Sequence, residues 1–193
     1  MAYDDQQLIT LFDRVFSKDK VFIHAHFGTN DLEDIFSKLR YLIVGCDCKW
    51  IVVDHLHMLV SSMTEGDERR AIDNIMTRLR SLVEETGAGV ILVSHLRRVQ
   101  GDKGHENGVS VSLSHLRGSN AIAQLSDTVI ALERNQQSED ELESRTTKLR
   151  VLKSRYTGDV GMATSLVYNK ETGRLSEFVD DELLNNQHNS VPF

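Results

Sequence analysis

Nearly unbroken apolar runs alternate along the chain with stretches in which apolar residues recur at helical spacing. Residues 50–54 and 90–94 form two such runs, which are typical of strands buried on both faces of a parallel sheet. Between them, residues 67–86 carry apolar side chains along one stripe, which predicts an amphipathic helix. The strand, helix and strand together predict a right-handed crossover unit of an α/β sheet.

The same patterns predict further elements on both sides of this unit. Residues 21–27 predict a strand, and residues 30–44 predict a helix with Asn30 or Asp31 as its N-cap. The other predicted elements are a polar loop at 97–118, a helix at about 119–126, strands at 128–132, 148–155, 163–168 and near Leu175, and an acidic surface loop at 136–145. The fold class that we predict is therefore α/β, a mostly parallel sheet flanked by helices with an antiparallel C-terminal extension.

The composition is that of a soluble globular protein. The chain has 193 residues, of which 40% are hydrophobic and 26% are charged. We expect one core over residues 1–178 and an acidic, flexible tail over residues 179–193. There is no apolar run of about 18 residues that could cross a membrane, and the acidic N-terminus is unlike a signal peptide. Cys46 and Cys48 form neither a disulfide framework nor a complete metal site, so reduced thiols in a cytoplasmic protein are expected.

The net charge of −7 argues against a chain that coats nucleic acid. A few basic residues in one loop can still contact phosphates, because such contacts act over about 8–10 Å. The basic residues in and around the polar loop are Arg97, Arg98, Lys103 and Arg117. They are candidate DNA contacts, and an ordinary solvated loop is the alternative.

Two polar residues end the predicted parallel strands. Asp54 ends the first strand, and His95 follows the second. Open α/β folds bind ligands at this edge, where an aspartate can hold Mg²⁺ and a histidine can contact a phosphate or exchange a proton. The alternatives are an aspartate that caps the following turn and a histidine hydrogen-bonded at a strand end.

Two further basic side chains, and Arg117 again, are candidates for binding an anion. Lys153 and Arg155 lie on one face of a predicted strand, which either binds a polyphosphate or is a solvated edge strand. Arg117 precedes the helix at 119–126, so it could bind an anion together with the backbone amides there.

Histidines at alternate positions permit a metal-dependent hydrolase, because alternate residues of a strand share a face. The two pairs are His24 with His26 and His55 with His57, which would act with Asp54 and His95. A (β/α)₈ hydrolase needs about 250 residues and a different order of elements. Ordinary histidines near strand ends are therefore the preferred interpretation.

Taken in order, the motifs closely resemble the RecA-like helicase domain of the phage primase–helicases. The mitochondrial and bacterial replicative helicases are more distant relatives. The resemblance extends from about Tyr41 to about Leu175. Its motifs are Asp54-His55, Ser94-His95, Leu116-Arg117-Gly118-Ser119, Asp127, Glu133-Arg134-Asn135-Gln136-Gln137, Lys153-x-Arg155-x-Thr157-Gly158 and Tyr168-Asn169-Lys170-Glu171-Thr172-Gly173.

The resemblance implies roles near the strand ends. Asp54 resembles the Walker B aspartate that holds Mg²⁺, and His95 resembles the histidine that senses the γ-phosphate and links it to the DNA loop. The loop from Arg97 to Arg117, which includes Arg98 and Lys103, resembles the segment that faces single-stranded DNA in the channel of a ring.

The resemblance also implies nucleotide contacts in the C-terminal third. Arg155 resembles an arginine finger, with Lys153 as its companion, and both would act on ATP held by the neighbouring subunit. Arg134 and Tyr168 resemble the pair that sandwiches the nucleotide base. Gln124 is assigned to the nucleotide with them.

The sequence departs from the family at its phosphate-binding loop. The motif G-x-x-x-x-G-K-S/T does not occur, and in the family this loop and the catalytic glutamate precede the segment that matches residue 1. Ala123 also stands where phage relatives carry a basic residue. We therefore expect the C-terminal part of a motor, from a split gene, a truncated frame or an expressed fragment. It would not hydrolyse ATP alone, and it would expose a sheet edge or face that upstream strands cover.

The expected function is that of an ATP-dependent replicative DNA helicase. The complete protein would be a hexameric ring that uses ATP and Mg²⁺ to move along single-stranded DNA in a phage replisome, in the cytoplasm of the infected bacterium. Its acidic tail would contact other replisome proteins. The alternatives are a non-catalytic module that binds DNA or joins a ring, and a recombinase or circadian-clock relative of RecA.

Overall fold

The computed structural model describes residues 4–16, 21–24, 31–61, 65–98, 104–118 and 120–178. The chain divides into two compact units. The first joins Met1–Arg97 to Leu116–Ser126, and the second joins Arg98–His115 to Asp127–Phe193. None of the helices in the described ranges is long and apolar enough to cross a membrane.

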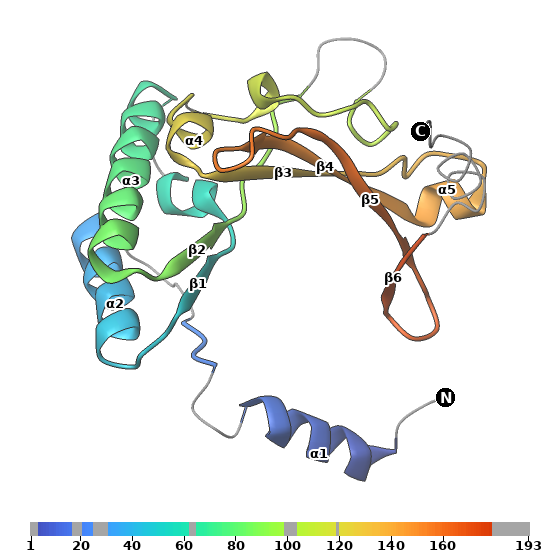
Figure 1. The fold of residues 1–193 in the computed structure, drawn as a ribbon, viewed down its shortest axis with the longest axis horizontal. Coiled ribbons are helices and arrows are strands. Elements are labelled where there is room, and N and C mark those ends of the chain that lie inside the picture. The colour runs from blue at the N-terminus through green and yellow to red at the C-terminus, as the bar shows by residue number, and fades with distance from the viewer. Residues whose placement is uncertain are drawn as a thin grey trace, which may run out of the picture. The chain divides into compact units, whose positions relative to one another are not determined.

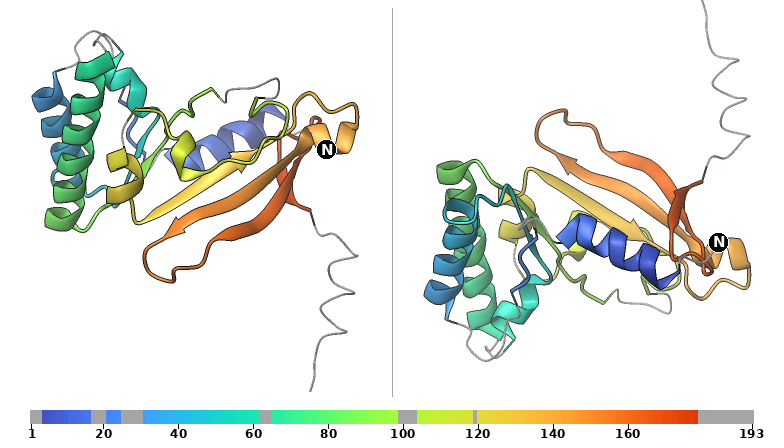
Figure 2. Two further views of the ribbon diagram at one scale, coloured as in Figure 1. Left: turned by 90° about the horizontal axis from the view of Figure 1, so that it is seen from above. Right: turned by 90° about the horizontal axis from the view of Figure 1, so that it is seen from below.

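Two parallel strands form the centre of the first unit (Figure 1). They pair in the register that places Val52 beside Ile91. A short 3₁₀ helix and a long α-helix connect them, which confirms the predicted strand–helix–strand unit. The elements of this unit are α1 (Asp5–Phe16), α2 (Leu32–Val44), β1 (Trp50–Val53), η1 (Leu56–Val60), α3 (Glu65–Thr86), β2 (Gly89–Leu92) and α4 (Asn120–Leu125). Helices α2 and α3 lie side by side in Figures 1 and 2.

The apolar stripe of α3 forms the core of the first unit. Ile72 and Ile75 are fully buried, and they are joined by buried side chains from η1, α2 and α4. The buried apolar residues of this unit in the described ranges are Phe36, Ile43, Ile51, Leu56, Val60, Ile72, Ile75, Met76, Leu79, Leu82, Ala88, Leu116 and Ile122. Each large apolar side chain buried in this way contributes about 1.5–3 kcal/mol, so α3 is the main source of cohesion in this unit.

Ile75→Ala is expected to lower the free energy of unfolding by about 2–5 kcal/mol, because it removes three buried carbons and leaves a cavity. Chemical denaturation of the chain measures this change. Asn74→Ala changes the neighbouring, exposed residue of the same helix and should alter stability by less than about 0.5 kcal/mol. Equal losses in the two variants would contradict the core assignment.

One face of the parallel pair is apolar and exposed. Ile51 is 7% exposed, whereas its neighbours Trp50 and Val52 are 67% and 64% exposed. The register places Ile91, which is 51% exposed, beside Val52 on the same face. An open apolar face of this kind agrees with the expectation that the chain exposes sheet surface.

A four-stranded antiparallel sheet forms most of the second unit (Figures 1 and 2). Its strands lie in chain order, and they are β3 (Thr128–Glu133), β4 (Thr146–Ser154), β5 (Gly161–Tyr168) and β6 (Leu175–Glu177). The 3₁₀ helix η2 (Leu113–His115) and the helix α5 (Glu141–Arg145) complete the unit. The predicted antiparallel C-terminal extension is confirmed, as is the α/β class.

Three expectations differ from the structure. Residues 21–24 do not form a strand, and residues 25–27 of that prediction lie outside the described residues. Helix α1 was not predicted, although Leu8, Leu11 and Phe12 recur at helical spacing within it. The acidic stretch 136–145 contains α5, because the side chain of Asp140 caps the helix by accepting from the backbone N–H groups of Leu142 and Glu143. Residues 179–193, the predicted tail, are also outside the described residues.

Candidate functional site

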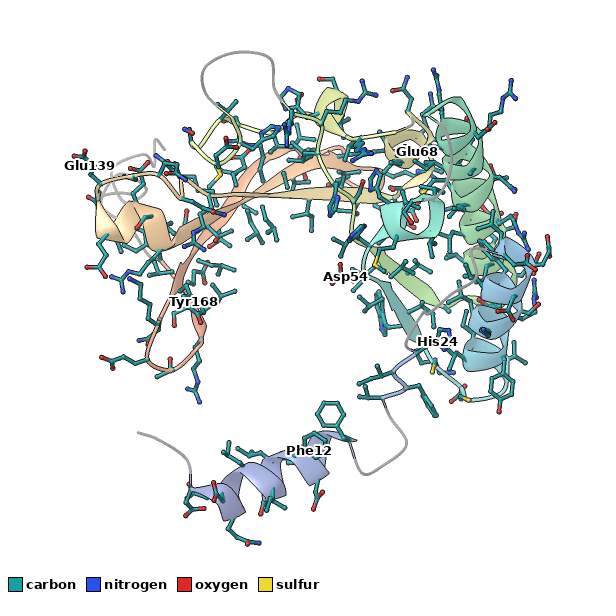
Figure 3. All side chains as sticks on the ribbon, turned by 180° about the vertical axis from the view of Figure 1, so that it is seen from behind. Phe12, His24, Asp54, Glu68, Glu139 and Tyr168 are labelled. Atoms are coloured by element: carbon teal, nitrogen blue, oxygen red, sulfur yellow. The ribbon has the colours of Figure 1, made fainter. Side chains whose placement is uncertain are left out.

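The ends of β1 and β2 bring Asp54 and His95 to the same edge of the parallel pair (Figure 3). The pairing continues past the strands, since the N–H of Val93 donates to the carbonyl oxygen of Val53 at 3.0 Å. The N–H of Leu56 then donates to the carbonyl oxygen of Val93 at 3.0 Å. Asp54 and His95 are both exposed, so this edge is open to a ligand.

Three histidine rings meet beside Asp54. The ring centroids of His55 and His95 are 3.9 Å apart, and those of His57 and His95 are 5.4 Å apart. His57 is 6% exposed, and its burial lowers its pKa below the ordinary value. It is therefore a neutral imidazole at pH 7.

His57 ties the segment at Arg117 to the strand ends. The N–H of His95 donates to its Nδ1 at 3.4 Å, so Nε2 carries the proton and donates to the carbonyl oxygen of Arg117 at 3.2 Å. The N–H of Arg117 in turn donates to the carbonyl oxygen of His95 at 3.1 Å. The backbone at Arg117 is thus coupled directly to that of His95, while its guanidinium lies 3.5 Å from Glu68.

The remaining candidate DNA contacts, and the residues in and before helix α4, lie at other places in the fold. Arg97 and Arg98 are exposed where the chain passes between the two units, and Lys103 lies outside the described residues. Gln124 is exposed on α4. Gly118 has a φ of +101°, and it packs so closely against Ile72 that a Cβ at this position would clash with that side chain. The first unit therefore contains Asp54, His95, Arg117 and Gln124.

Arg155 follows β4 in the second unit and is held by Asp127. Its Nη1 lies 3.1 Å from Oδ1 of Asp127, and its N–H donates to the carbonyl oxygen of Asp127 at 2.8 Å. The Arg155 side chain is 40% exposed, so it remains within reach of a ligand. Lys153, two residues earlier in β4, pairs with Val129. Asp127 was noted as part of a motif, but its role as the partner of Arg155 was missed.

Arg134 and Tyr168, the second of which is labelled in Figure 3, lie by register at the opposite end of the same sheet. Arg134 follows β3 and Tyr168 ends β5, with the start of β4 between them. The Nε of Arg134 donates to the carbonyl oxygen of Ser144 at 2.6 Å. Asn169 builds the turn after Tyr168, because its side chain accepts from the N–H groups of Glu171 and Thr172 at 2.9 Å each.

Glu133 was noted as part of a motif, but its burial and its partners were not predicted from the sequence. Its Oε1 accepts from the N–H of Val111 at 2.7 Å and from Nε of Arg150 at 2.9 Å. The hydrogen bond to Glu133 and its negative charge raise the pKa of Arg150, and the bond from Val111 fixes that segment to the sheet. A cavity of about 310 Å³ beside them includes Arg134 and Lys148 in its lining. The only sequence signal is an acid that ends an otherwise apolar strand.

Comparisons with known proteins identify the family of this chain and a similar fold. Residues 2–177 match the family model of the DnaB-like helicase C terminal domain. The "DNA helicase/primase" of Enterobacteria phage T3 is 40% identical over 172 residues, which are 89% of this chain and 30% of that protein. The chain thus spans less than a third of this relative's length. The crystal structure of a KaiC-like protein from Pyrococcus horikoshii OT3 has a TM-score of 0.58 at 13% identity, covering 87% of this chain and 64% of that one.

Proposed function

Because this chain belongs to the DnaB-like helicase C-terminal domain family, we propose that it is the C-terminal portion of an ATP-dependent replicative DNA helicase. The observation that carries the proposal is the edge where β1 and β2 end. Asp54 and His95 meet there. One hydrogen bond couples His95 directly to Arg117, and His57 bonds to both residues. Groups for a nucleotide and for DNA would thus share one rigid edge.

In this proposal Asp54 binds the Mg²⁺ that accompanies ATP. Carboxylate oxygens are suitable Mg²⁺ ligands, and the Asp54 side chain is exposed at the edge where α/β folds bind ligands, so the residue fits the ion. Bound Mg²⁺ neutralises charge on the phosphates. His95 contacts the γ-phosphate, and Gln124 contributes a contact to the nucleotide.

Arg155 and Lys153 serve a different nucleotide from Arg134 and Tyr168. Asp127 and Arg134 flank the six-residue strand β3, so at about 3.3 Å per residue the two ends of the sheet are roughly 20 Å apart. This separation supports a ring in which Arg134 and Tyr168 enclose the base of one ATP. Arg155 and Lys153 would then reach the phosphates of the neighbour's ATP. The ring proposed here is a hexamer.

Single-stranded DNA is the proposed polymer ligand. Arg97, Arg98 and Lys103 would contact its phosphates, together with Arg117. Because the Arg117 N–H bonds to the His95 carbonyl, a shift of His95 on loss of the γ-phosphate would reach this segment without an intervening residue. The phage T3 relative supports a setting in phage replication, in the cytoplasm of the infected bacterium. The acidic tail is proposed to contact other replisome proteins.

The alternative is a non-catalytic module that binds DNA or joins a ring. The absence of G-x-x-x-x-G-K-S/T from the sequence favours it for the chain alone, because that loop supplies the amides and lysine that hold the phosphates.

Complementation separates the motor from the module. DNA-stimulated ATPase activity is measured for the chain alone and for the chain mixed with a polypeptide that carries the phosphate-binding half of such a domain. We expect activity in the mixture and none in either component alone. Absence of activity in the mixture would favour the module, and activity of the chain alone would overturn the proposed need for the missing loop.

A further inference from the structure

His55, His57 and His95 together have the geometry of a metal site. Their ring nitrogens all lie within 4.8 Å of one another. In a tetrahedral Zn²⁺ site, Zn–N bonds of about 2.0–2.1 Å place two nitrogens about 3.4 Å apart. The ligand nitrogens would therefore have to approach one another by about 1.4 Å at most, and His95 is exposed at the end of its strand.

The His57 ring already presents an unprotonated nitrogen that can donate its lone pair to a metal ion. The Nε2–H of His57 is fixed by the carbonyl oxygen of Arg117, which leaves Nδ1 unprotonated. This is the arrangement that metal-binding histidines adopt, with the second nitrogen donating to a carbonyl. The contact of Nδ1 with the His95 N–H is long, at 3.4 Å, and is easily replaced.

His55 supplies an independent indication. Its Nδ1 is buried and has no hydrogen-bond partner among the described residues. A buried polar atom in this state costs free energy unless a ligand satisfies it. A metal ion between the three rings would do so.

We propose that His55, His57 and His95 bind one divalent ion of the Zn²⁺ class, with a fourth position open to water. Imidazole nitrogens favour Zn²⁺ and similar ions, whereas Mg²⁺ requires oxygen ligands, so this site is chemically distinct from the Asp54 carboxylate. The binding itself does not depend on the proposed helicase function. Its consequence does rest on that function: Zn²⁺ bound here holds His95 away from the nucleotide.

The test is calorimetric titration of the full chain with Zn²⁺ in the absence of nucleotide, together with the visible absorption of bound Co²⁺. We expect one ion per chain and tetrahedral Co²⁺ absorption. His57→Ala and His95→Ala are each expected to weaken binding at least about tenfold. His95 is exposed, so its variant keeps the test valid even if His57→Ala fails to fold.

Two controls exclude the other metal-binding groups. Cys46→Ser/Cys48→Ser removes the two cysteines, and His115→Ala breaks the His105–His115 ring pair, whose centroids are 5.0 Å apart. Both controls should bind Zn²⁺ as the unaltered chain does. The proposal is overturned if the unaltered chain binds no Zn²⁺, or if binding survives His95→Ala and is lost in either control. Neither result would bear on the ATPase of the complemented chain.

Discussion

Arg155→Ala is expected to lower kcat of the DNA-stimulated ATPase by about 10³-fold or more when the chain is complemented with a phosphate-binding half. An arginine finger contributes about 10³–10⁵-fold to kcat, because its positive charge stabilises the phosphoryl group during transfer. A nucleotide site without its neighbouring subunit lacks this charge. The position suits this role, since Asp127 orients the guanidinium while leaving it 40% exposed. The measurement is the steady-state rate of phosphate release at saturating ATP and DNA.

Two further variants test whether the loss of activity is specific to the guanidinium of Arg155. Arg155→Lys keeps the charge but not the planar fork of donors, so it should recover only a small part of the rate. Arg174→Ala removes an exposed arginine near the other end of the sheet and should leave kcat within about twofold of the unaltered value. An Arg155→Ala protein with nearly full activity would remove Arg155 from the nucleotide site.

Asp54→Asn is expected to lower the same activity at least about a hundredfold and to raise the Mg²⁺ concentration needed for half-maximal rate. A carboxylate that binds Mg²⁺ supports several kcal/mol of charge stabilisation at the phosphates, and an amide oxygen is a much weaker ligand. Rates measured over a Mg²⁺ titration test both parts. Asp47→Asn is the matched control, because Asp47 is an exposed aspartate paired with Lys49 in a loop of the same unit. An unchanged Mg²⁺ dependence in Asp54→Asn would place the metal elsewhere.

Local patterns were sufficient to predict the strand–helix–strand part of the first unit. The apolar runs at 50–54 and 90–94 and the stripe of α3 correspond to β1, β2 and the core helix, since a continuous apolar run or a helical stripe has few other ways to be buried. The order of the strands then implied that Asp54 and His95 meet at one edge. This part of the candidate site was therefore accessible from the sequence together with the family resemblance.

Partners that depend on strand register were not predictable. The pairing of Arg155 with Asp127 requires that β3 and β4 align over their whole length, and the sequence does not specify that alignment. The same holds for Glu133, whose burial against Arg150 follows from its place in the register. Helix α5 was missed for a different reason, because its stability comes from the Asp140 cap rather than from an apolar stripe.

Ordinary histidines near strand ends were the preferred interpretation, and His55 and His57 do lie just after β1; only the alternative placed them on a strand. The sequence pairs His55 with His57 by alternation along a strand, but the structure ends β1 at Val53, before either residue. It is the fold of η1 back toward β2 that brings both rings to His95. Contacts that depend on such a reversal of the chain cannot be inferred from spacing alone.

Asp54 and Arg155 of one chain are proposed to serve two different nucleotides, and mixing two inactive variants distinguishes this arrangement from a single shared site. Asp54→Asn and Arg155→Ala chains are combined in equal amounts with the phosphate-binding half, and ATPase activity is measured. If the finger acts across subunits, roughly a quarter of the interfaces in a randomly mixed ring contain both intact residues, and a similar share of the activity returns. If the mixture stays as inactive as its components, Asp54 and Arg155 belong to the same site or to none, and the account is contradicted.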